Sequence, residues 1–580
     1  GNIVQDFSVN TAMLNADSVT SIKIDDGTIV NADINASAAI AKTKLAALEI
    51  VNADVNASAA IAGSKISPTF TTDGSFNSIA IGKGANSVAG NTVLGENALD
   101  AAVTGGNNTA IGKLTLTDLT SATNNTAVGL QAGKEVTTGA SNTLIGVNAG
   151  FNLTSGFQNV AIGVSSLDAC ETGGSNVAIG INALGSNTVS NNVAVGTSAL
   201  AANTTGTHNT AVGTLTLDAN TTGARLTGVG YEALSANTTA DDNTAFGYQA
   251  LKANTIGNLN VAIGRGALAS NTTAQGSTAV GNNALATNST GVHNTAVGRD
   301  AGLNITTGTQ HVAVGAFALD SQTTGQDCTA MGYAALASNT TASHNVAIGS
   351  FSLDANTTGD QNTALGRATL SENTTASNNT AVGYHALVTN TTGANNTAVG
   401  TQALDANTTA GSNVAIGKNA LGANTTGDVN TAVGTSSLLL NTTASSNTAV
   451  GGGSMFYNTT GSQNTAVGRD SLYSNTTGIY NVALGYQSQY VNSTGSNNTS
   501  VGWRSLDSNT TASNNTAVGM NALQANTTGT QITAVGSNAL SSFVSGTAQL
   551  TAVGYDALKL CTTAYNTAVG WQAGDAITTG

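Results

Sequence analysis

The sequence predicts an all-β protein, a parallel β-solenoid of about thirty coils of 17 residues each. Glycines recur every 17 residues without a slip from Gly213 to Gly536, and equivalent glycines continue on both sides of this stretch. An apolar residue stands directly before nearly every one of them. The chain also has 69 Gly, one Pro and only 8% charged residues, unlike an ordinary soluble enzyme. A fixed period kept for this long is the signature of a solenoid.

The chain divides into two parts. Residues 1–77 carry a different, 21-residue period, seen as IVNADINASAAIAKTKLAALE at 29–49 and IVNADVNASAAIAGSKISPTF at 50–70. We expect this part to be an N-terminal shaft or connector, followed by a β-solenoid rod over residues 78–580.

One coil is seen clearly at 209–225 as NTAVGTLTLDANTTGAR, and its positions are numbered here from Gly213 as zero. Asn209 to Gly213, positions −4 to 0, read as a short strand. Val212 at position −1 is replaced in other coils only by similar apolar residues, which predicts a buried side chain. Ala211 at position −2 then faces the other side of the strand, because neighbouring strand residues point in opposite directions. The small Ala predicts either a tight coil or, as we favour, a surface against which a second chain packs.

An exchange within the repeat identifies two interior positions. Position +4 is normally Leu and position +7 normally Asn, as in Leu217 with Asn220. In four coils position +4 is instead glycine and position +7 is apolar, which conserves volume if both side chains share one cramped interior. These pairs are Gly133 with Val136, Gly150 with Leu153, Gly302 with Ile305, and Gly574 with Ile577.

The Asn at +7 begins a repeated Asn-Thr-Thr, which matches the N-glycosylation pattern. An inward residue cannot carry a glycan. We therefore favour an Asn ladder, in which each amide bonds to its copy in the next coil. Cys170 and Cys561 replace this Asn, and Cys328 replaces the Asn at −4, where small buried thiols fit as filler. The three cysteines lie too far apart along the rod to pair within one chain.

Composition and motifs exclude several function classes. A formal charge of −14 argues against a nucleic-acid partner, and no apolar run reaches the roughly 20 residues that span a bilayer. Asp recurs at position +5 but never in adjacent coils, so the carboxylates form no acid/base pair. We expect no catalytic residues, cofactor or metal, and no enzyme activity.

One column of residues is a candidate surface for a ligand. Position +1 often holds an aromatic side chain, which could stack on sugar rings; we favour the simpler interpretation that these rings cover the coil edge or a neighbouring chain. The column comprises Tyr231, Tyr248, Tyr333, Tyr384, Tyr486, Trp503, Tyr555 and Trp571.

The segment DGTIVNADINASAAIAKTKL (26–45) resembles the N-terminal and shaft regions of tailed-phage tail fibres, especially those of marine phages. The NTAVG and NVAIG repeats resemble the head repeats of trimeric autotransporter adhesins, which implies a left-handed β-roll wound as a homotrimer. One thin coil also buries little apolar surface for the residues it orders, which independently favours trimerisation.

These resemblances imply a structural fibre of the virion, a tail-fibre shaft that is anchored at one end and helps attach to a glycan or protein receptor on the host. The alternative is a bacterial cell-surface or extracellular adhesin or filament. An ice-binding solenoid is a remote third expectation, because of the many threonines. The last coil ends at Gly580 without a polar cap, which predicts further protein or end-to-end assembly of rods.

Overall fold

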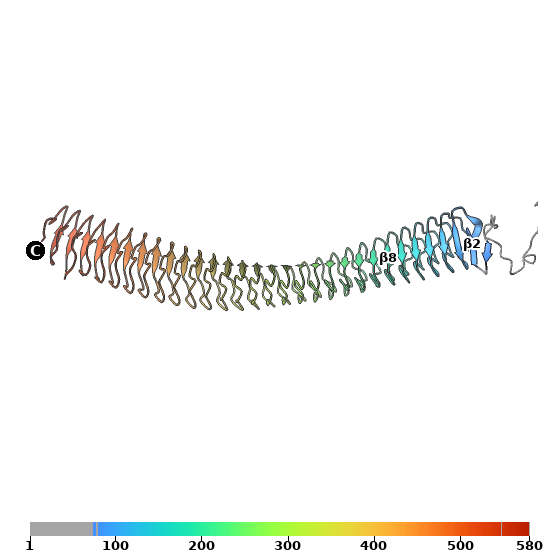
Figure 1. Cartoon of the computed structure of the whole chain (residues 1–580), viewed down its shortest axis with the longest axis horizontal. Helices are drawn as coiled ribbons and strands as arrows, with labels where there is room; N and C mark the ends of the chain where they lie inside the picture. The colour runs from blue at the N-terminus through green and yellow to red at the C-terminus, as the bar shows by residue number, and fades with distance from the viewer. Residues whose placement is uncertain (1–73, 77–78, 547, 579–580) are drawn as a thin grey trace, which may run out of the picture. The chain divides into compact units, whose positions relative to one another are not determined.

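The computed structural model describes residues 74–76, 79–546 and 548–578. Within them, strands follow one another in a single row, one strand for each coil (Figure 1). Each strand from β3 to β31 pairs in parallel with the next, and the register advances by one repeat, so that Ala211 lies opposite Gly228. The expected all-β parallel solenoid is confirmed. The 21-residue repeats at 29–70 lie outside the described residues.

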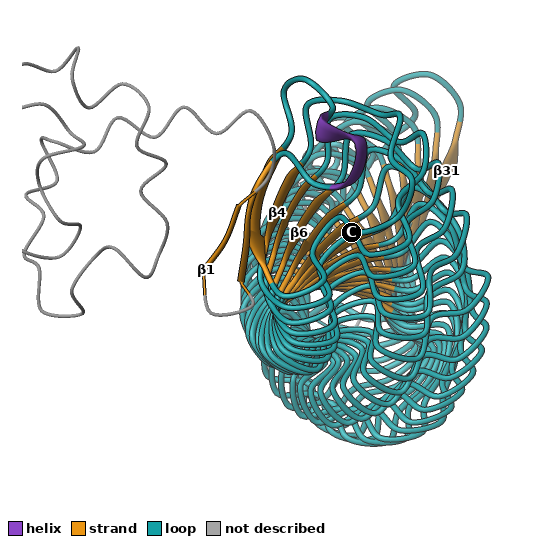
Figure 2. Ribbon diagram, turned by 90° about the vertical axis from the view of Figure 1, so that its right-hand side faces the viewer, coloured by secondary structure: helices purple, strands orange, loops and turns teal. Residues whose placement is uncertain are grey.

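The strands are short and nearly identical in length, because each coil has only three extended residues before the chain turns at the glycine. Viewed along the rod, they form one wall of the coil, and loops form the remainder (Figure 2). Their bounds are β3 Thr92–Gly95, β4 Thr109–Ile111, β5 Thr126–Val128, β6 Thr143–Ile145, β7 Val160–Ile162, β8 Val177–Ile179, β9 Val193–Val195, β10 Thr210–Val212, β11 Thr227–Val229, β12 Thr244–Phe246, β13 Val261–Ile263, β14 Thr278–Val280, β15 Thr295–Val297, β16 Val312–Val314, β17 Thr329–Met331, β18 Val346–Ile348, β19 Thr363–Leu365, β20 Thr380–Val382, β21 Thr397–Val399, β22 Val414–Ile416, β23 Thr431–Val433, β24 Thr448–Val450, β25 Thr465–Val467, β26 Val482–Leu484, β27 Thr499–Val501, β28 Thr516–Val518, β29 Thr533–Val535, β30 Thr551–Val553 and β31 Thr567–Val569.

The first described strands are arranged differently. β1 (Gly74–Phe76) pairs antiparallel with β2 (Ile79–Gly82), and β2 pairs antiparallel with β3. Residues 83–91, which include a single 3-10 turn at Ala85–Ser87, are too few for the crossover that a parallel neighbour needs. Gly82 fits the repeat in sequence, but the parallel stack of strands begins only at β3.

The glycine at position 0 is required by close packing between coils. Gly213 has φ 135°, and a Cβ atom there would lie 2.6 Å from the carbonyl oxygen of Gly230 in the next coil. No side chain fits at that distance, and L-residues avoid this backbone region. The glycines whose period predicts the solenoid thus lie where successive coils contact each other most closely.

The two faces of the strand are opposite to our expectation. Ala211 at −2 is 0% exposed and points into the coil, whereas Val212 at −1 is 37% exposed and points outward. The interior beside Leu217 is narrow: a Cβ at Gly228, the −2 residue of the next coil, would lie 2.7 Å from Thr216 Cγ2 and 3.4 Å from Leu217 Cδ1. The prediction that Val212 is buried in its own coil is wrong, and so is the prediction that Ala211 packs against a second chain.

Leu144 shows that the space available in the interior decides the size of the residue at −2. It is the residue at −2 in its coil and is fully buried. Room for it comes from the glycines at +4 in the same and the preceding coil, because a Cβ at Gly133 would lie 2.5 Å from Leu144 Cδ1 and one at Gly150 2.8 Å from Leu144 Cδ2. The interior therefore keeps its volume across neighbouring coils as well as within one.

Candidate functional site

The interior of the rod holds two ladders of asparagine. At +7, Asn220 is 0% exposed, and its Nδ2 donates to Asn203 Oδ1 of the preceding coil at 2.8 Å and to the carbonyl of Gly223 at 3.0 Å. Asn237 repeats the bond to Asn220 at 2.9 Å. The expected inward ladder is confirmed. An Asn with no exposed surface and a bonded amide is not available for a glycan.

The second ladder runs through the Asn at −4, such as Asn209, which is 1% exposed. Its Oδ1 accepts the backbone N–H of Leu226 in the next coil at 2.9 Å, and its Nδ2 donates to the carbonyl of Gly223 at 2.8 Å. Each such side chain therefore satisfies backbone groups at a corner where no strand pairing does so.

The exchange between positions +4 and +7 also has the expected physical basis. Leu217 is fully buried beside Asn220. Where glycine stands at +4, the apolar residue at +7 fills the vacated space: a Cβ at Gly302 or at Gly574 would lie 2.9 Å from the Cδ1 of Ile305 or Ile577. The three cysteines are buried and free, and burial raises the pKa of the Cys170 and Cys328 thiols to about 11, so neither is a nucleophile.

The outer surface is where a partner or ligand can bind, and the aromatic column at +1 lies there. Its eight side chains, from Tyr231 to Trp571, are each between 40% and 71% exposed. Tyr231 stacks on Tyr248 at 5.5 Å, and Tyr555 on Trp571 at 6.5 Å, so these two pairs of rings connect adjacent coils. This agrees with rings that cover the coil edge; nothing in the structure tests sugar stacking on them.

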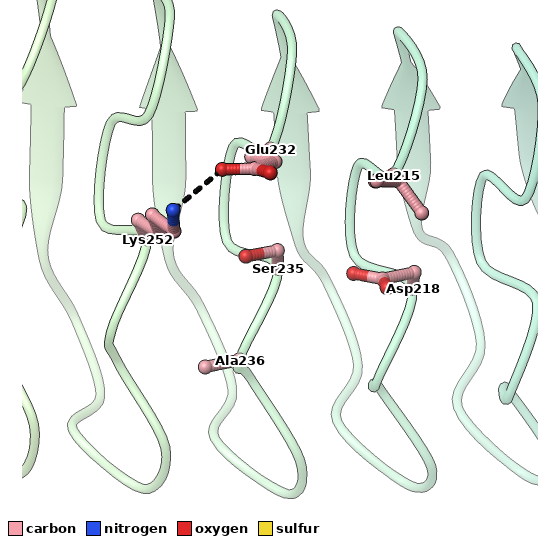
Figure 3. Close-up of a pocket in the computed structure, with 6 residues that line it drawn as sticks. All are labelled: Leu215, Asp218, Glu232, Ser235, Ala236 and Lys252. Carbon is pink, nitrogen blue, oxygen red and sulfur yellow. Dashed lines mark ion pairs between the residues drawn. The ribbon is translucent and has the colours of Figure 1, made fainter.

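Five of the carboxylates at +5 are half-buried. Burial raises the pKa of Asp168, Asp218, Asp320, Asp354 and Asp405. The surroundings of Asp218 form a surface hollow of about 180 Å³ between coils, shown in Figure 3. There Lys252 Nζ lies 2.6 Å from Glu232 Oε2. Hydrogen bonds from Lys252, Gln249 and Tyr231 lower the pKa of Glu232 to about 2.

This arrangement has no acid, base and nucleophile in mutual contact. Its cation, Lys252, pairs with Glu232, which lines the hollow together with Asp218; burial is the main cause of the raised pKa of Asp218, and the charge of Glu232 adds to it. Across the described residues, no group of three or more His, Cys, Asp or Glu side chains could hold a metal ion. None of the helical segments described is both long and apolar enough to cross a bilayer.

Two non-repeating features escaped the sequence analysis. One is a second aromatic stack at position +5, where Phe456, Tyr473 and Tyr490 have ring centroids 5.2 and 5.0 Å apart. The other is buried His311, which replaces an Asn of the −4 ladder. A search for residues that depart from the repeat at an otherwise regular position would have found both.

Neither protein-family models nor curated proteins give a match to this chain.

Proposed function

We propose that this protein is a structural fibre, the shaft of a phage tail fibre that assembles from parallel copies of the chain and extends toward a host surface. The observation that carries the proposal is an apolar stripe on the outer face of the sheet. It is formed by the residues at −1, and ten of them from β6 to β31 are between 37% and 69% exposed: Ile145, Val212, Phe246, Ile263, Val297, Met331, Leu365, Ile416, Val467 and Val569.

The stripe continues through coil after coil of the parallel sheet. The largest apolar patch on a monomeric protein usually covers roughly 300–600 Å². An apolar stripe that runs along the whole parallel sheet is therefore expected to be buried against another surface. A second and third copy of the same chain offer stripes of equal length and spacing, which is why a homotrimer is the assembly we favour. In this proposal the outward-facing residues at −1, rather than Ala211, pack against a second chain.

The test is the mass of the native protein, with charges placed on the stripe. We expect a trimer by light scattering for the unmodified chain. The double variant Ile416→Lys with Val450→Lys should dissociate the trimer to the monomer, fully or in part, because each Lys places a charge in the proposed interface. Thr401→Lys with Thr435→Lys, at exposed +1 positions, is the matched control. A monomeric mass for the unmodified chain would refute the assembly.

The repeat pattern also supports a second candidate, a bacterial cell-surface or extracellular adhesin built from the same trimeric rod. Labelling particles and cells with an antibody to the rod separates the two: the first predicts label on virions, the second on cell envelopes. An ice-binding role is the third candidate. The outward residues of a typical strand are Thr210 and Val212 rather than two threonines, so we expect no thermal hysteresis.

A further inference from the structure

One corner of the rod, formed by positions +5 and +6, departs from the repeat between Gln402 and Tyr490. Elsewhere the +5 column holds mainly Asp, Ala, Ser and Lys. In these coils it passes from Asp405 through Gly422 to Leu439 and then to the aromatic stack that begins at Phe456. Residues that recur at the same position in every coil stabilise the fold. The varied +5 residues of these coils are not needed for that, so we considered whether this corner binds a ligand.

Gly422 leaves a hollow on the surface of this corner. The hollow has a volume of about 410 Å³, larger than the one beside Asp218, and lies within the range of roughly 300–1,000 Å³ of small-molecule sites. A Cβ atom at Gly422 would lie 3.1 Å from Leu439 Cδ1 and 3.3 Å from Asp405 Oδ1. A larger side chain at this position would therefore occupy the hollow.

One wall of the hollow is polar. Gln402, Asp405 and Asn419 line it. The side-chain amides of Gln402 and Asn419 form no hydrogen bond to any other described residue, so their donors and acceptors are available to a ligand. Asp405 adds a half-buried carboxylate, whose pKa is raised by burial.

The opposite wall is apolar. Leu439 and Leu440, at +5 and +6 of one coil, form it. The aromatic side chains of the following coils continue the apolar surface along the rod, with Tyr457 43% exposed and in edge-to-face contact with Tyr473 at 5.3 Å. Polar groups on one side and hydrocarbon on the other match a ligand with hydroxyls at its rim and C–H bonds on its face.

We propose that the Gly422 hollow binds one ring of a neutral carbohydrate. The ring's hydroxyl groups donate to Asp405 and exchange hydrogen bonds with the amides of Gln402 and Asn419, while its C–H face lies on Leu439 and Leu440. A neutral sugar is favoured over an anionic one, because Asp405 lines the hollow and the chain carries a formal charge of −14. The site lies on the side of the rod, and only the natural source of the sugar, a host surface, rests on the proposed function.

The experiment is saturation-transfer NMR on the full chain with cellotriose, maltotriose and tri-N-acetylchitotriose at millimolar concentration. We expect transfer to at least one of them. Gly422→Leu should reduce it at least tenfold, because the new side chain fills the hollow, and the backbone at Gly422 needs no left-handed conformation. Ala337→Leu, at +5 of a coil without this hollow, should leave the transfer unchanged.

No transfer to any of the three sugars would overturn the proposal, and so would equal transfer to the Gly422→Leu protein. Stronger transfer to sialyllactose than to the neutral sugars would contradict the charge argument and with it the ligand class. Failure of the fibre proposal is a different result: a monomeric mass or absence from virions leaves the sugar signal and its dependence on Gly422 as they are.

Discussion

Coils of residues 345–526 and the two coils around His311 share the same backbone period but differ in their interiors. In the first region both Asn ladders are continuous, as at Asn390, which donates to Asn373 Oδ1 and to the carbonyl of Gly393 at 2.9 Å each. Around His311 both ladders are replaced in succession, by Ile305 and Gln322 at +7 and by His311 and Cys328 at −4.

His311 reproduces the bonding of the Asn it replaces. In a regular coil, Asn362 Oδ1 accepts the N–H of Asn379 at 3.0 Å, and Asn362 Nδ2 donates to the carbonyl of Ala376 at 2.8 Å. His311 Nδ1 accepts the N–H of Cys328 at 3.2 Å, and Nε2 lies 2.8 Å from the carbonyl of Gly325. The carbonyl requires a proton on Nε2, so the imidazole is neutral with Nδ1 as the acceptor.

Cys328 reproduces the hydrogen bonds of the Asn at −4 less well than His311 does. Its Sγ lies 3.4 Å from the carbonyl of Ala342, and sulfur in place of an amide oxygen faces the N–H of Asn345. The corner therefore requires one acceptor and one donor at fixed spacing rather than Asn itself. The glycine at position 0, in contrast, is unchanged in both regions, because its role is steric.

The largest effect is expected where the two regions agree. Gly383→Ala places a Cβ 2.6 Å from the carbonyl oxygen of Gly400, at φ 133°. We expect a loss of about 3 kcal/mol or more in local stability, measured by native-state hydrogen exchange of the amides in β20 and β21. Gly422→Ala, whose nearest contact is 3.1 Å and whose φ is not positive, should change little. Equal effects of the two would contradict the steric role of the glycine column.

A second experiment makes a regular coil resemble the interrupted one. Asn390→Ile removes the two hydrogen bonds that Asn390 donates and the one that it accepts from Asn407 Nδ2, which keeps only the carbonyl of Ala410. The Ile side chain also crowds Leu387. We expect a loss of about 3 kcal/mol in the same exchange measurement. Adding Leu387→Gly copies the natural Gly302–Ile305 pair and should recover about half of it. A double variant no more stable than the single one would show that volume is not what couples these positions.

The third experiment makes the interrupted coil regular. Burial lowers the pKa of His311 below its ordinary value, although Gly325, the nearby Asp327 carboxylate and Cys328 oppose this. Asp327 itself pairs with His344 at 3.6 Å. Because the folded state favours neutral His311, its contribution is complete above about pH 6.5 and is lost as pH falls from there through the folded pKa.

We therefore expect amides near Cys328 to exchange faster at pH 5 than at pH 7.5, beyond the intrinsic chemical rate. The cost is about 1.4 kcal/mol for each pH unit by which the folded pKa lies below the unfolded one. His311→Asn restores the regular bonds and should abolish the dependence. His293→Asn, at an exposed position, should retain it, and a flat profile in the unmodified chain would refute the role of His311.

The smallest effect concerns the turn at +12. Val429 has φ 58° and is 59% exposed, a strained conformation for a β-branched residue. Asn, which occupies this position in other coils, tolerates it better. Val429→Asn should stabilise the coil by about 1 kcal/mol, read from exchange of the amides in β22 and β23. Val429→Ala should gain less, and a destabilised Asn variant would show that Val429 makes contacts outside its own chain.

The sequence alone predicts the period, the parallel stack, the inward Asn at +7 and the shared space of positions +4 and +7, because each depends on residues that vary together or not at all. It could not determine which face of the three-residue strand is inside. Both Ala211 and Val212 are apolar, and alternation defines two faces without assigning them. The tertiary structure decides, since Leu217 already fills the interior and leaves room only for a methyl group.

The candidate sites divide in the same way. The aromatic column at +1 was found because it repeats. The Gly422 hollow was not, because it depends on three neighbouring coils whose +5 residues share no pattern. Nor could the sequence show that Leu215 and Leu217 adopt left-handed backbone conformations, with φ 55° each. Such conformations are unfavourable for isolated L-residues and are held here by burial and by hydrogen bonds to the adjacent coils, such as that from Leu217 N to the carbonyl of Ala233 at 3.0 Å.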